Sequence, residues 1–199
     1  MASIVENKDD NTGGHVKRTS DVIRILIDVI KETEILDLSE QFCEDLIKAA
    51  PMHDLGKVGI NDKILCKPGR LTEEEFAIMQ THVLKSENLV NNILQGVEED
   101  HFIKVARNVA KYHHEKWNGN GYPEHLKEEN IPLEARIMAI ADVYDALVSK
   151  RCYKKSMSFE EAETVMLESM GSHFDPNLKQ VFILSKPKLE EYYRQNESQ

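Results

Sequence analysis

The sequence predicts a single all-α domain. In several segments, apolar residues recur three, four and seven positions apart, which is the spacing of one helix face, and no segment alternates as a half-buried strand does. Candidate helix starts are marked by Ser, Thr or Asp placed three residues before Glu. A chain of 199 residues is long enough to bury the core of one domain.

The first predicted helix covers residues 15–33, where Val16, Ile23, Ile27 and Ile30 fall close to one face. The pattern has the period of a helix rather than that of a strand, so this segment is expected to bury one side against the rest of the domain.

A second helix is predicted through residues 41–54, because Asp37 and Glu40 resemble a capping box before it. Pro51 lies within this run and is expected to bend or shorten the helix. Residues 55–70 are punctuated by Gly and Pro, so they are predicted to form a loop.

Thr72 and Glu75 form a clearer capping box, which predicts a helix that runs to about Leu94. A further helix is expected over residues 102–114, followed by a loop at 118–123, which contains two Asn-Gly pairs and a Pro. The remaining predicted helices begin at Pro132 (continuing through 133–149), at Ser158 with Glu161, and at Pro176 and Pro187.

The composition narrows the possible functions. A net charge of -10 argues against a nucleic-acid polymer as a partner, because such binding relies on many Lys and Arg contacts to phosphate. No apolar run approaches the roughly 18 residues of a membrane span, and the N-terminus lacks the features of a signal peptide. We therefore expect a cytoplasmic protein without membrane insertion, with three scattered and reduced thiols: Cys43, Cys66 and Cys152.

Candidate metal ligands occur as two adjacent pairs, 53-HD-54 and 113-HH-114, and as single residues elsewhere. Adjacent side chains on a helix diverge by roughly 100°, so an adjacent pair suits two neighbouring ions better than one. Taken alone, each residue has an ordinary explanation as a structural or surface side chain. Together they make the donor set of a first-row divalent metal, without sulfur, on several helices. The set is His15, His53, Asp54, His82, His113, His114 and Asp142.

The order of the motifs resembles a known family. The segment 53-HDLGKVGI-60 resembles the HD-x-G-K signature of the HD superfamily of metal-dependent phosphohydrolases. The segments 113-HHEKWNGNGYP-123 and 136-RIMAIADVYDAL-147 are similar to those of the HD-GYP domain. The resemblance extends from about His15 to Pro176 through four further stretches: 67-KPGRLTEEEF-76, 131-IPLEARI-137, 151-RCYKKSMSFEEA-162 and 171-GSHFDP-176.

The resemblance implies an HD-domain helical bundle that encloses a metal centre and hydrolyses cyclic dinucleotides, mainly the bacterial second messenger cyclic di-GMP. It implies that all seven candidates bind two divalent transition metal ions, with iron or manganese expected, and that Asp54 bridges them. A hydroxide between the two ions is then expected to attack phosphorus, giving linear pGpG and possibly GMP.

The resemblance also implies contacts to the substrate. Lys57 matches the lysine that contacts the scissile phosphate, which makes it catalytic together with Asp54. Arg151 and Lys154 match family positions that hold phosphate. Tyr122 is expected either to contact a guanine or its sugar, or to pack the loop.

Asp145 has three interpretations at this stage: it orients a ligand, contacts substrate or is structural. Gly121 and Pro123 are expected to shape the loop, and Arg136 is expected to be a structural ion-pair partner. Trp117 is expected to pack that loop. The remaining histidines are expected to be surface or capping residues: His101, His125 and His173.

Three functions stay open. The first is hydrolysis of cyclic di-GMP, and the second is an HD-GYP hydrolase specific for cyclic GMP-AMP. The third is a sensor that binds a cyclic dinucleotide without cutting it, which is disfavoured because the ligand motifs are intact. A regulatory receiver or sensor domain or protein, and a homodimer, are the partners expected besides the substrate.

The predicted organisation is residues 1–14 as an N-terminal extension, or as residues added for expression, and residues 15–199 as the HD-GYP domain. Some members of the family hold a third metal with a glutamate four residues before the first histidine. That position is Asn11 here, and its neutral carbonyl is a far weaker ligand than a carboxylate, so a binuclear centre is expected.

Overall fold

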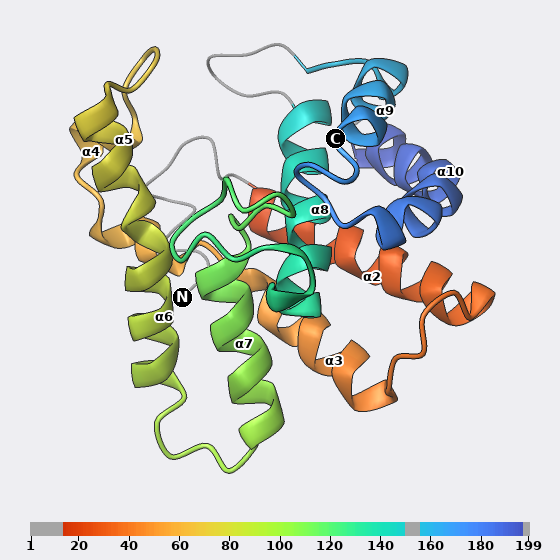
Figure 1. Ribbon diagram of the computed structural model, residues 1–199, viewed down its shortest axis with the longest axis horizontal. Helices are drawn as coiled ribbons and strands as arrows, with labels where there is room; N and C mark the ends of the chain where they lie inside the picture. Colours follow the sequence, from red (N-terminus) through yellow and green to blue (C-terminus); the bar gives the residue numbers. More distant parts are fainter. Residues whose placement is uncertain (1–13, 150–155, 197–199) are drawn as a thin grey trace.

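A computed structural model describes residues 14–149 and 156–196 as a bundle of helices (Figure 1). This part of the chain contains no named strand, only an isolated bridge between Met170 and Phe174, so the all-α prediction is confirmed. In chain order the elements are α2 (His15–Thr33), α3 (Glu40–Ala49), η1 (Ala50–Met52), η2 (Leu55–Gly59), α4 (Asp62–Leu65), α5 (Glu73–Gln80), α6 (His82–Ile93), α7 (Asp100–Tyr112), η3 (Glu128–Asn130), α8 (Leu133–Val148), α9 (Phe159–Glu168), η4 (Pro176–Leu178) and α10 (Lys179–Asn196).

The bundle is built around α2 and α8. Helix α2 packs against α8 and α10, while α7 joins α6 on one side to α3 on the other (Figure 1). The apolar face predicted for α2 lies in the core, where Ile23, Ile27 and Ile30 are almost completely buried. Tyr144 of α8 and Phe182 of α10 add the largest rings to this core. The core holds the elements in place around the centre described below.

The second helix has a different N-cap from the one predicted. Its N-cap is Ser39, whose hydroxyl accepts a hydrogen bond from the Phe42 N–H at 3.2 Å, so the predicted capping box that starts at Asp37 is wrong. Ser39 caps the helix in place of Asp37 because it stands directly before the first helical residue, where its side-chain oxygen reaches a backbone N–H of the first turn. Pro51 shortens the helix as predicted: the α-helix ends at Ala49, and the 3₁₀ turn η1 follows.

The predicted loop at residues 55–70 contains two short helices instead, η2 and α4. The capping box of Thr72 and Glu75 is confirmed, but the long helix predicted after it is two helices, α5 and α6, that meet at Thr81. The Thr81 hydroxyl donates to the Ile78 carbonyl at 2.6 Å, which gives that carbonyl a partner where the helix is interrupted.

The C-terminal segment also departs from the prediction. Pro176 opens η4 as expected, but Pro187 lies inside the single helix α10. A proline in a helix costs about 3 kcal/mol because it removes a hydrogen bond and crowds the preceding turn. Phe182 before it and Leu189 and Tyr193 after it are buried, and this packing offsets the cost.

Among residues 14–149 and 156–196, no helix combines the length and the apolar character needed to cross a bilayer. In the same part of the chain, Cys43 is a buried free thiol and Cys66 a half-buried one, while Cys152 lies outside the described residues.

Candidate metal centre

The structure brings all seven candidate ligands together. Most of them stand at the ends of helices, so the centre lies where several elements begin or end. They are His15 at the start of α2, His53 and Asp54 between η1 and η2, His82 at the start of α6, His113 and His114 after the end of α7, and Asp142 within α8.

The ligands fall into two groups. Within each group, one donor atom of every residue lies within 4.8 Å of the donor atoms of the others. One group is Asp54, His82, His113 and His114; the other is His15, His53 and Asp142.

Asp54 joins the two groups, because each of its oxygens faces a different one. Its Oδ1 lies 3.3 Å from the Nε2 of His82 and 3.7 Å from the Nε2 of His113. Its Oδ2 lies 3.2 Å from the Nε2 of His53 and 3.9 Å from the Nε2 of His15. A carboxylate placed in this way can ligate two cations at once.

The orientation of four imidazoles fits metal binding. The Nδ1 atoms of His53, His82 and His113 lie 2.8, 2.7 and 2.9 Å from the backbone carbonyls of residues 50, 79 and 109. A carbonyl only accepts, so each Nδ1 carries the proton and each Nε2 keeps a lone pair. His15 makes the same contact to the Asp145 carboxylate at 2.6 Å. Metal-ligating histidines in proteins are held in this way.

The inward-facing atoms support the same conclusion. The Nε2 atoms of His53, His82 and His113 and the Oδ1 of Asp54 are buried without a hydrogen-bond partner. Leaving one buried polar atom unpaired costs about 1–3 kcal/mol, so four of them at one point need an explanation. A shared cation partner supplies one, and the residues present therefore fit a metal centre.

The charges of the site favour a cation. Burial opposes ionisation of Asp54, but the Lys57 ammonium and the nearby imidazoles hold the pKa of this carboxyl well below its usual range. Burial likewise opposes ionisation of Asp142, whose pKa His15 holds low. In turn, Asp142 and Asp145 outweigh the effect of burial on His15 and raise its pKa to about 9. The same two carboxylates would attract a divalent ion, which displaces the proton on His15 when it binds.

His113 and His114, unlike His15, are held in the neutral form. Burial lowers the pKa of His113, and burial together with the neighbouring His113 lowers the pKa of His114 well below its usual value. Neutral imidazole is the form that binds metal.

Gly56 explains how the HD-x-G-K segment is placed. A Cβ at this position would lie 2.0 Å from the carbonyl oxygen of His82 and 2.4 Å from the backbone nitrogen of Ser86. The Gly56 N–H also donates to the Ser86 hydroxyl at 2.7 Å. Only glycine allows η2 to lie directly on α6, and this contact fixes Asp54 beside His82. Lys57 follows, and its Nζ lies 2.6 Å from Asp54 Oδ2.

The loop after His114 is held by a residue that the sequence interpretation did not single out. Glu115 is buried and accepts hydrogen bonds from the backbone N–H groups of Glu124 and Leu126, at 2.7 and 3.1 Å. Gly121 packs so closely on this turn that an added Cβ would lie 2.4 Å from the Glu115 Cα. In the sequence, the only sign of this role is that Glu115 stands just before a loop rich in Asn-Gly pairs.

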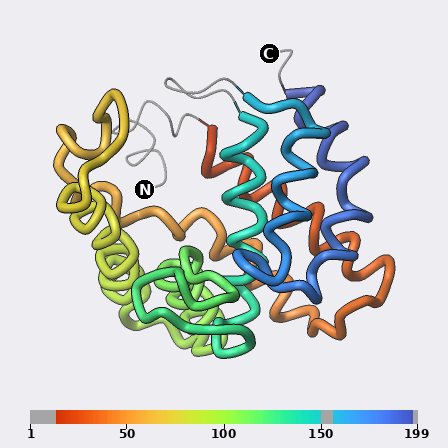
Figure 2. Tube along the Cα trace, turned by 45° about the horizontal axis from the view of Figure 1, so that its top comes forward, coloured from red at the N-terminus to blue at the C-terminus, as the bar shows by residue number. Residues whose placement is uncertain are grey.

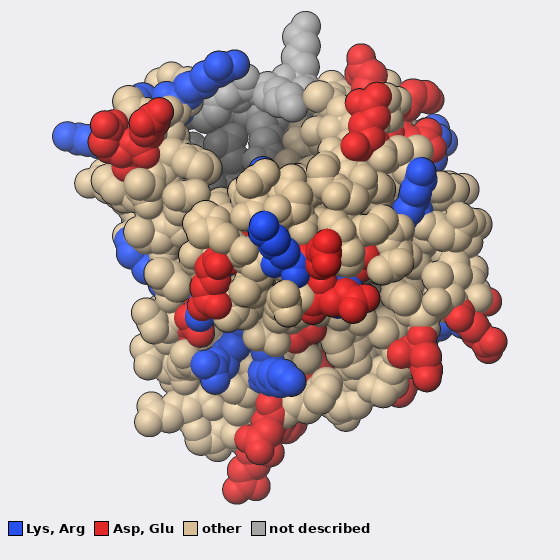
Figure 3. All heavy atoms as spheres, viewed as in Figure 1, with Lys and Arg blue, Asp and Glu red and all other residues tan. Residues whose placement is uncertain are grey.

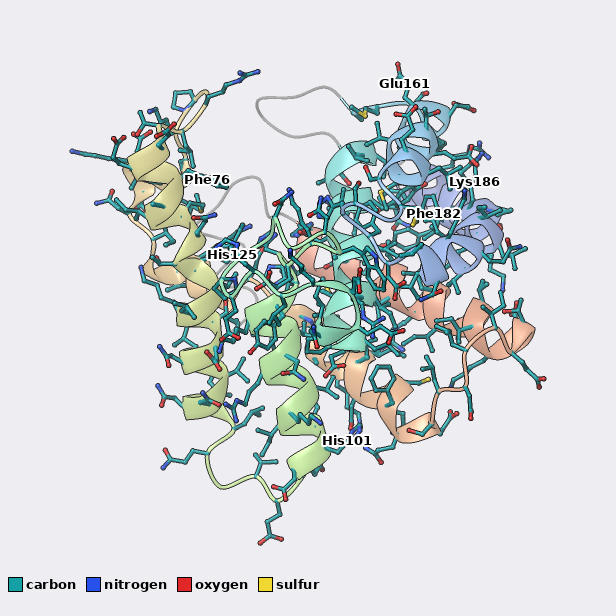
Figure 4. The ribbon with its side chains drawn as sticks, viewed as in Figure 1. Phe76, His101, His125, Glu161, Phe182 and Lys186 are labelled. Atoms are coloured by element: carbon teal, nitrogen blue, oxygen red, sulfur yellow. The ribbon has the colours of Figure 1, made fainter. Side chains whose placement is uncertain are left out.

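Two aromatic rings line the edge of the centre. The ring centroids of Tyr122 and His114 are 4.9 Å apart. Phe76 of α5, labelled in Figure 4, lies edge-on to Tyr122 with the centroids 6.2 Å apart. Phe76 is 47% exposed, which is unusual for a phenylalanine. The sequence interpretation missed it, because a phenylalanine four residues after a helix cap resembles an ordinary core residue.

Asp145 lies fully buried behind the centre rather than on its open side. It receives hydrogen bonds from His15, Arg18, Ser149 and Tyr193. Of the three roles considered, this geometry fits the orientation of His15. A substrate contact needs an accessible oxygen, and the Asp145 side chain exposes none.

The other singled-out residues are placed as follows. Arg136 forms an ion pair with the buried Asp175 at 2.5 Å and lies over the Trp117 ring, which agrees with a structural role for both. His101, at the far end of α7 (Figure 4), is half exposed and its Nδ1 lies 2.6 Å from Asp45.

Two further histidines lie in loops. His125 is an exposed residue of the loop after α7, whereas His173 is half-buried, stacks on Phe174 and accepts a hydrogen bond from the Trp117 N–H. His173 is therefore a packing residue and not a surface or capping one. Asn11, Arg151 and Lys154 lie outside the described residues.

A helical bundle with a two-part histidine and aspartate centre defines a class, that of HD-type metal-binding domains. The HD domain family model matches residues 1–178. The chain is 44% identical over 190 residues to a probable cyclic di-GMP phosphodiesterase of Vibrio cholerae, covering 94% of this chain and 43% of that protein. It is 38% identical over 183 residues to 3'3'-cGAMP-specific phosphodiesterase 2 of the same organism, covering 92% and 33%.

Among solved structures, a cyclic GMP-AMP-specific phosphodiesterase of V. cholerae superposes with a TM-score of 0.64 at 22% identity, over 95% of this chain and 49% of that one. This likeness shows the fold. The chain belongs to the HD-domain family. It spans less than half the length of the curated relatives described above.

Proposed function

We propose that this chain is a metal-dependent phosphodiesterase domain that hydrolyses cyclic di-GMP to linear pGpG and, in a second cut, to GMP. The observation that carries the proposal is the pair of ligand groups joined by Asp54. The chain's similarity to relatives named as cyclic di-GMP phosphodiesterases supports it.

The seven ligands would hold two divalent transition metal ions, for which we propose iron or manganese because imidazole and carboxylate suit both. When bound, such a pair of ions lowers the pKa of water and neutralises phosphate charge. The chain's own residues supply the positioning. Asp54 holds the two ligand groups in place relative to each other. Lys57 lies beside Asp54, where its ammonium can donate a hydrogen bond to a non-bridging phosphate oxygen.

Substrate binding must overcome the net charge of the protein. A cyclic dinucleotide is dianionic, the chain carries -10, and the face in Figure 3 shows acidic and basic side chains of the described residues interspersed. Attraction therefore has to come from the centre and from local bases such as Lys57. We assign Arg151 and Lys154 to the phosphates by family position, and we assign the Tyr122 ring, with Phe76 beside it, to the base or sugar.

The decisive experiment incubates the purified chain, loaded anaerobically with Mn(II) or Fe(II), with cyclic di-GMP and follows pGpG by chromatography. Asp54→Asn should abolish product, since the residue shared by both groups is lost. Asp45→Asn is the matched control: Asp45 is equally buried but contacts Gln41 and His101 instead. Loss of activity in both variants, or none in Asp54→Asn, would contradict the proposal.

A second candidate is hydrolysis of 3'3'-cGAMP, because several relatives carry that name. Comparing kcat/KM for cyclic di-GMP and 3'3'-cGAMP under the same metal loading decides between them, and we expect the larger value for cyclic di-GMP. Tight binding of either compound without product would instead identify a sensor.

We propose the cytoplasm as the location of the domain, because the proposed substrate is an intracellular bacterial messenger. A regulatory receiver or sensor domain is a proposed partner, because one relative is named a response regulator and the chain covers 48% of it. The homodimer remains a prediction, to be checked by light scattering.

A further inference from the structure

Asp145 accepts hydrogen bonds from four residues: two on α2, one on α10 and the residue that follows α8. Its Oδ2 lies 2.6 Å from the Nδ1 of His15 and 3.2 Å from the Arg18 Nη2. Its Oδ1 accepts from Arg18 Nε at 2.6 Å, from the Ser149 hydroxyl at 2.8 Å and from the Tyr193 hydroxyl at 2.7 Å. Three donors therefore share one oxygen, and the other oxygen is turned toward His15.

Tyr193 is the donor that the C-terminal helix contributes. It comes from α10, which packs along α2 at the edge of the bundle away from α6 (Figures 1 and 2). The residue is 3% exposed, and its ring is fixed edge-on against Tyr144 at 5.7 Å. A buried carboxylate rotates about its Cβ–Cγ bond unless hydrogen bonds hold it, and the rigid Tyr193 hydroxyl is placed to stop that rotation.

We propose that Tyr193 is a positioning residue: through Asp145 it fixes the ring of His15, and so the C-terminal helix α10 sets the cation affinity of the group formed by His15, His53 and Asp142. The inference rests on the proposed metal centre and deepens it. Residues that hydrogen-bond to a metal-ligating histidine typically change metal affinity by about 10–100-fold. Tyr193 is one hydrogen bond further from the histidine, because it contacts Asp145 and Asp145 contacts His15. The expected effect is therefore about tenfold or less.

The neighbouring residue supplies a matched control. Tyr192 also lies on α10 and donates its hydroxyl to an aspartate, Asp21, at 2.8 Å, but it has no hydrogen bond to Asp145. Tyr193→Phe and Tyr192→Phe each remove one hydroxyl and keep the ring. Ser149→Ala removes a different donor to the same Asp145 oxygen and serves as the second test variant.

The test is titration of the full apo chain with Mn(II), in which free Mn(II) is followed by electron paramagnetic resonance. Tyr193→Phe and Ser149→Ala should weaken one of the two binding steps by about three- to tenfold, and excess Mn(II) should restore kcat to the wild-type value. Tyr192→Phe should bind as the wild type does. Circular dichroism checks that each variant is folded.

Wild-type Mn(II) binding by both Tyr193→Phe and Ser149→Ala would overturn the inference, as would an equal loss in Tyr192→Phe. A wild type that binds Mn(II) but does not cut a cyclic dinucleotide contradicts the proposed activity alone, because the titration still measures the effect of Tyr193. A wild type that binds no divalent ion contradicts both.

Discussion

Single residues decide which atoms of the centre are available. The backbone carbonyls and Asp145 accept hydrogen bonds from the Nδ1–H groups of four histidines, so the Nε2 atoms all point inward. The order in the sequence cannot show this, since a histidine binds metal through either nitrogen. The adjacent pairs His53–Asp54 and His113–His114 were each expected to serve two ions. The structure places His53 and Asp54 in different groups, with Asp54 also facing the group of His53, whereas His113 and His114 lie in the same group.

At Lys57, truncation should slow the chemistry without emptying the centre. Lys57→Ala removes the ammonium beside Asp54 and leaves every candidate ligand in place, so Mn(II) stoichiometry should stay at the wild-type value. Loss of one such electrostatic contact lowers kcat by roughly 100-fold or more. Steady-state kinetics with metal analysis measures both quantities. The exposed Lys63→Ala is the control, and loss of metal from Lys57→Ala would show that the lysine is needed for the centre itself.

Phe76→Ala should act on binding instead. Stacking of a base on an aromatic ring contributes about 1–3 kcal/mol, so KM for cyclic di-GMP should rise about tenfold or more while kcat stays within about twofold. Stability should change little, because the ring is 47% exposed.

Ile78→Ala is the control for Phe76→Ala: it is 45% exposed on the same helix but lies roughly 200° around it. A fall in kcat at unchanged KM would contradict the role assigned to Phe76.

At the scale of elements, local signals predicted the helices better than their ends. The helix at His15–Thr33 and the capping boxes at Thr72 and Ser158 appear as predicted, because each depends on residues close in sequence. The interruption at Thr81 and the unbroken α10 around Pro187 were not predictable, because packing against distant helices decides them.

The same distinction applies to the site. The candidate ligands were recognised through motifs, whereas the contacts of Phe76, Glu115 and Tyr193 are recorded by no motif. Tyr193, for example, is 48 residues from the aspartate it holds. Sequence spacing carries no information on such a pair, since the fold alone brings the two side chains together.

The contact between η2 and α6 yields a prediction at this scale. Gly56→Ala forces a Cβ against the backbone of α6, so η2 must move away and carry Asp54 with it. We expect a loss of 1–3 kcal/mol in the free energy of unfolding, as is typical of overpacking, and a loss of Mn(II) binding. Urea denaturation and metal analysis check the two effects.

Gly59→Ala is the control for Gly56→Ala, because it lies in the same 3₁₀ helix and its Cβ would meet only the flexible Lys85 side chain, at 3.0 Å. It should stay near wild type in both measurements. Retention of full metal binding by Gly56→Ala would show that close packing of η2 is not what places Asp54.

At the scale of the whole molecule, the candidate metal centre connects several helices of the bundle. Its ligands belong to α2, α6, α7, α8 and the segment between η1 and η2, so a cation that binds only the native arrangement should stabilise the entire domain. At about 100 times Kd the gain is about 2.7 kcal/mol, which corresponds to a rise in Tm of roughly 5–10 °C for a domain of this size.

Differential scanning calorimetry with Mn(II) and with a chelator measures this rise in Tm. In Asp54→Asn the two melting curves should coincide, and Asp45→Asn should keep the difference. An equal rise in Asp54→Asn would mean that the stabilising ion binds elsewhere on the protein.

The carboxylate of Asp54 has a consequence for the energetics of loading. Since one oxygen serves each group, the two cation sites form a single linked equilibrium rather than two separate ones. Reciprocity then applies: by whatever factor the first ion changes the affinity for the second, the second changes the affinity for the first. The proposed activity, which needs both ions, should accordingly follow the square of metal availability when metal is scarce, so the proposed turnover of a messenger would depend on the cell's supply of the ion.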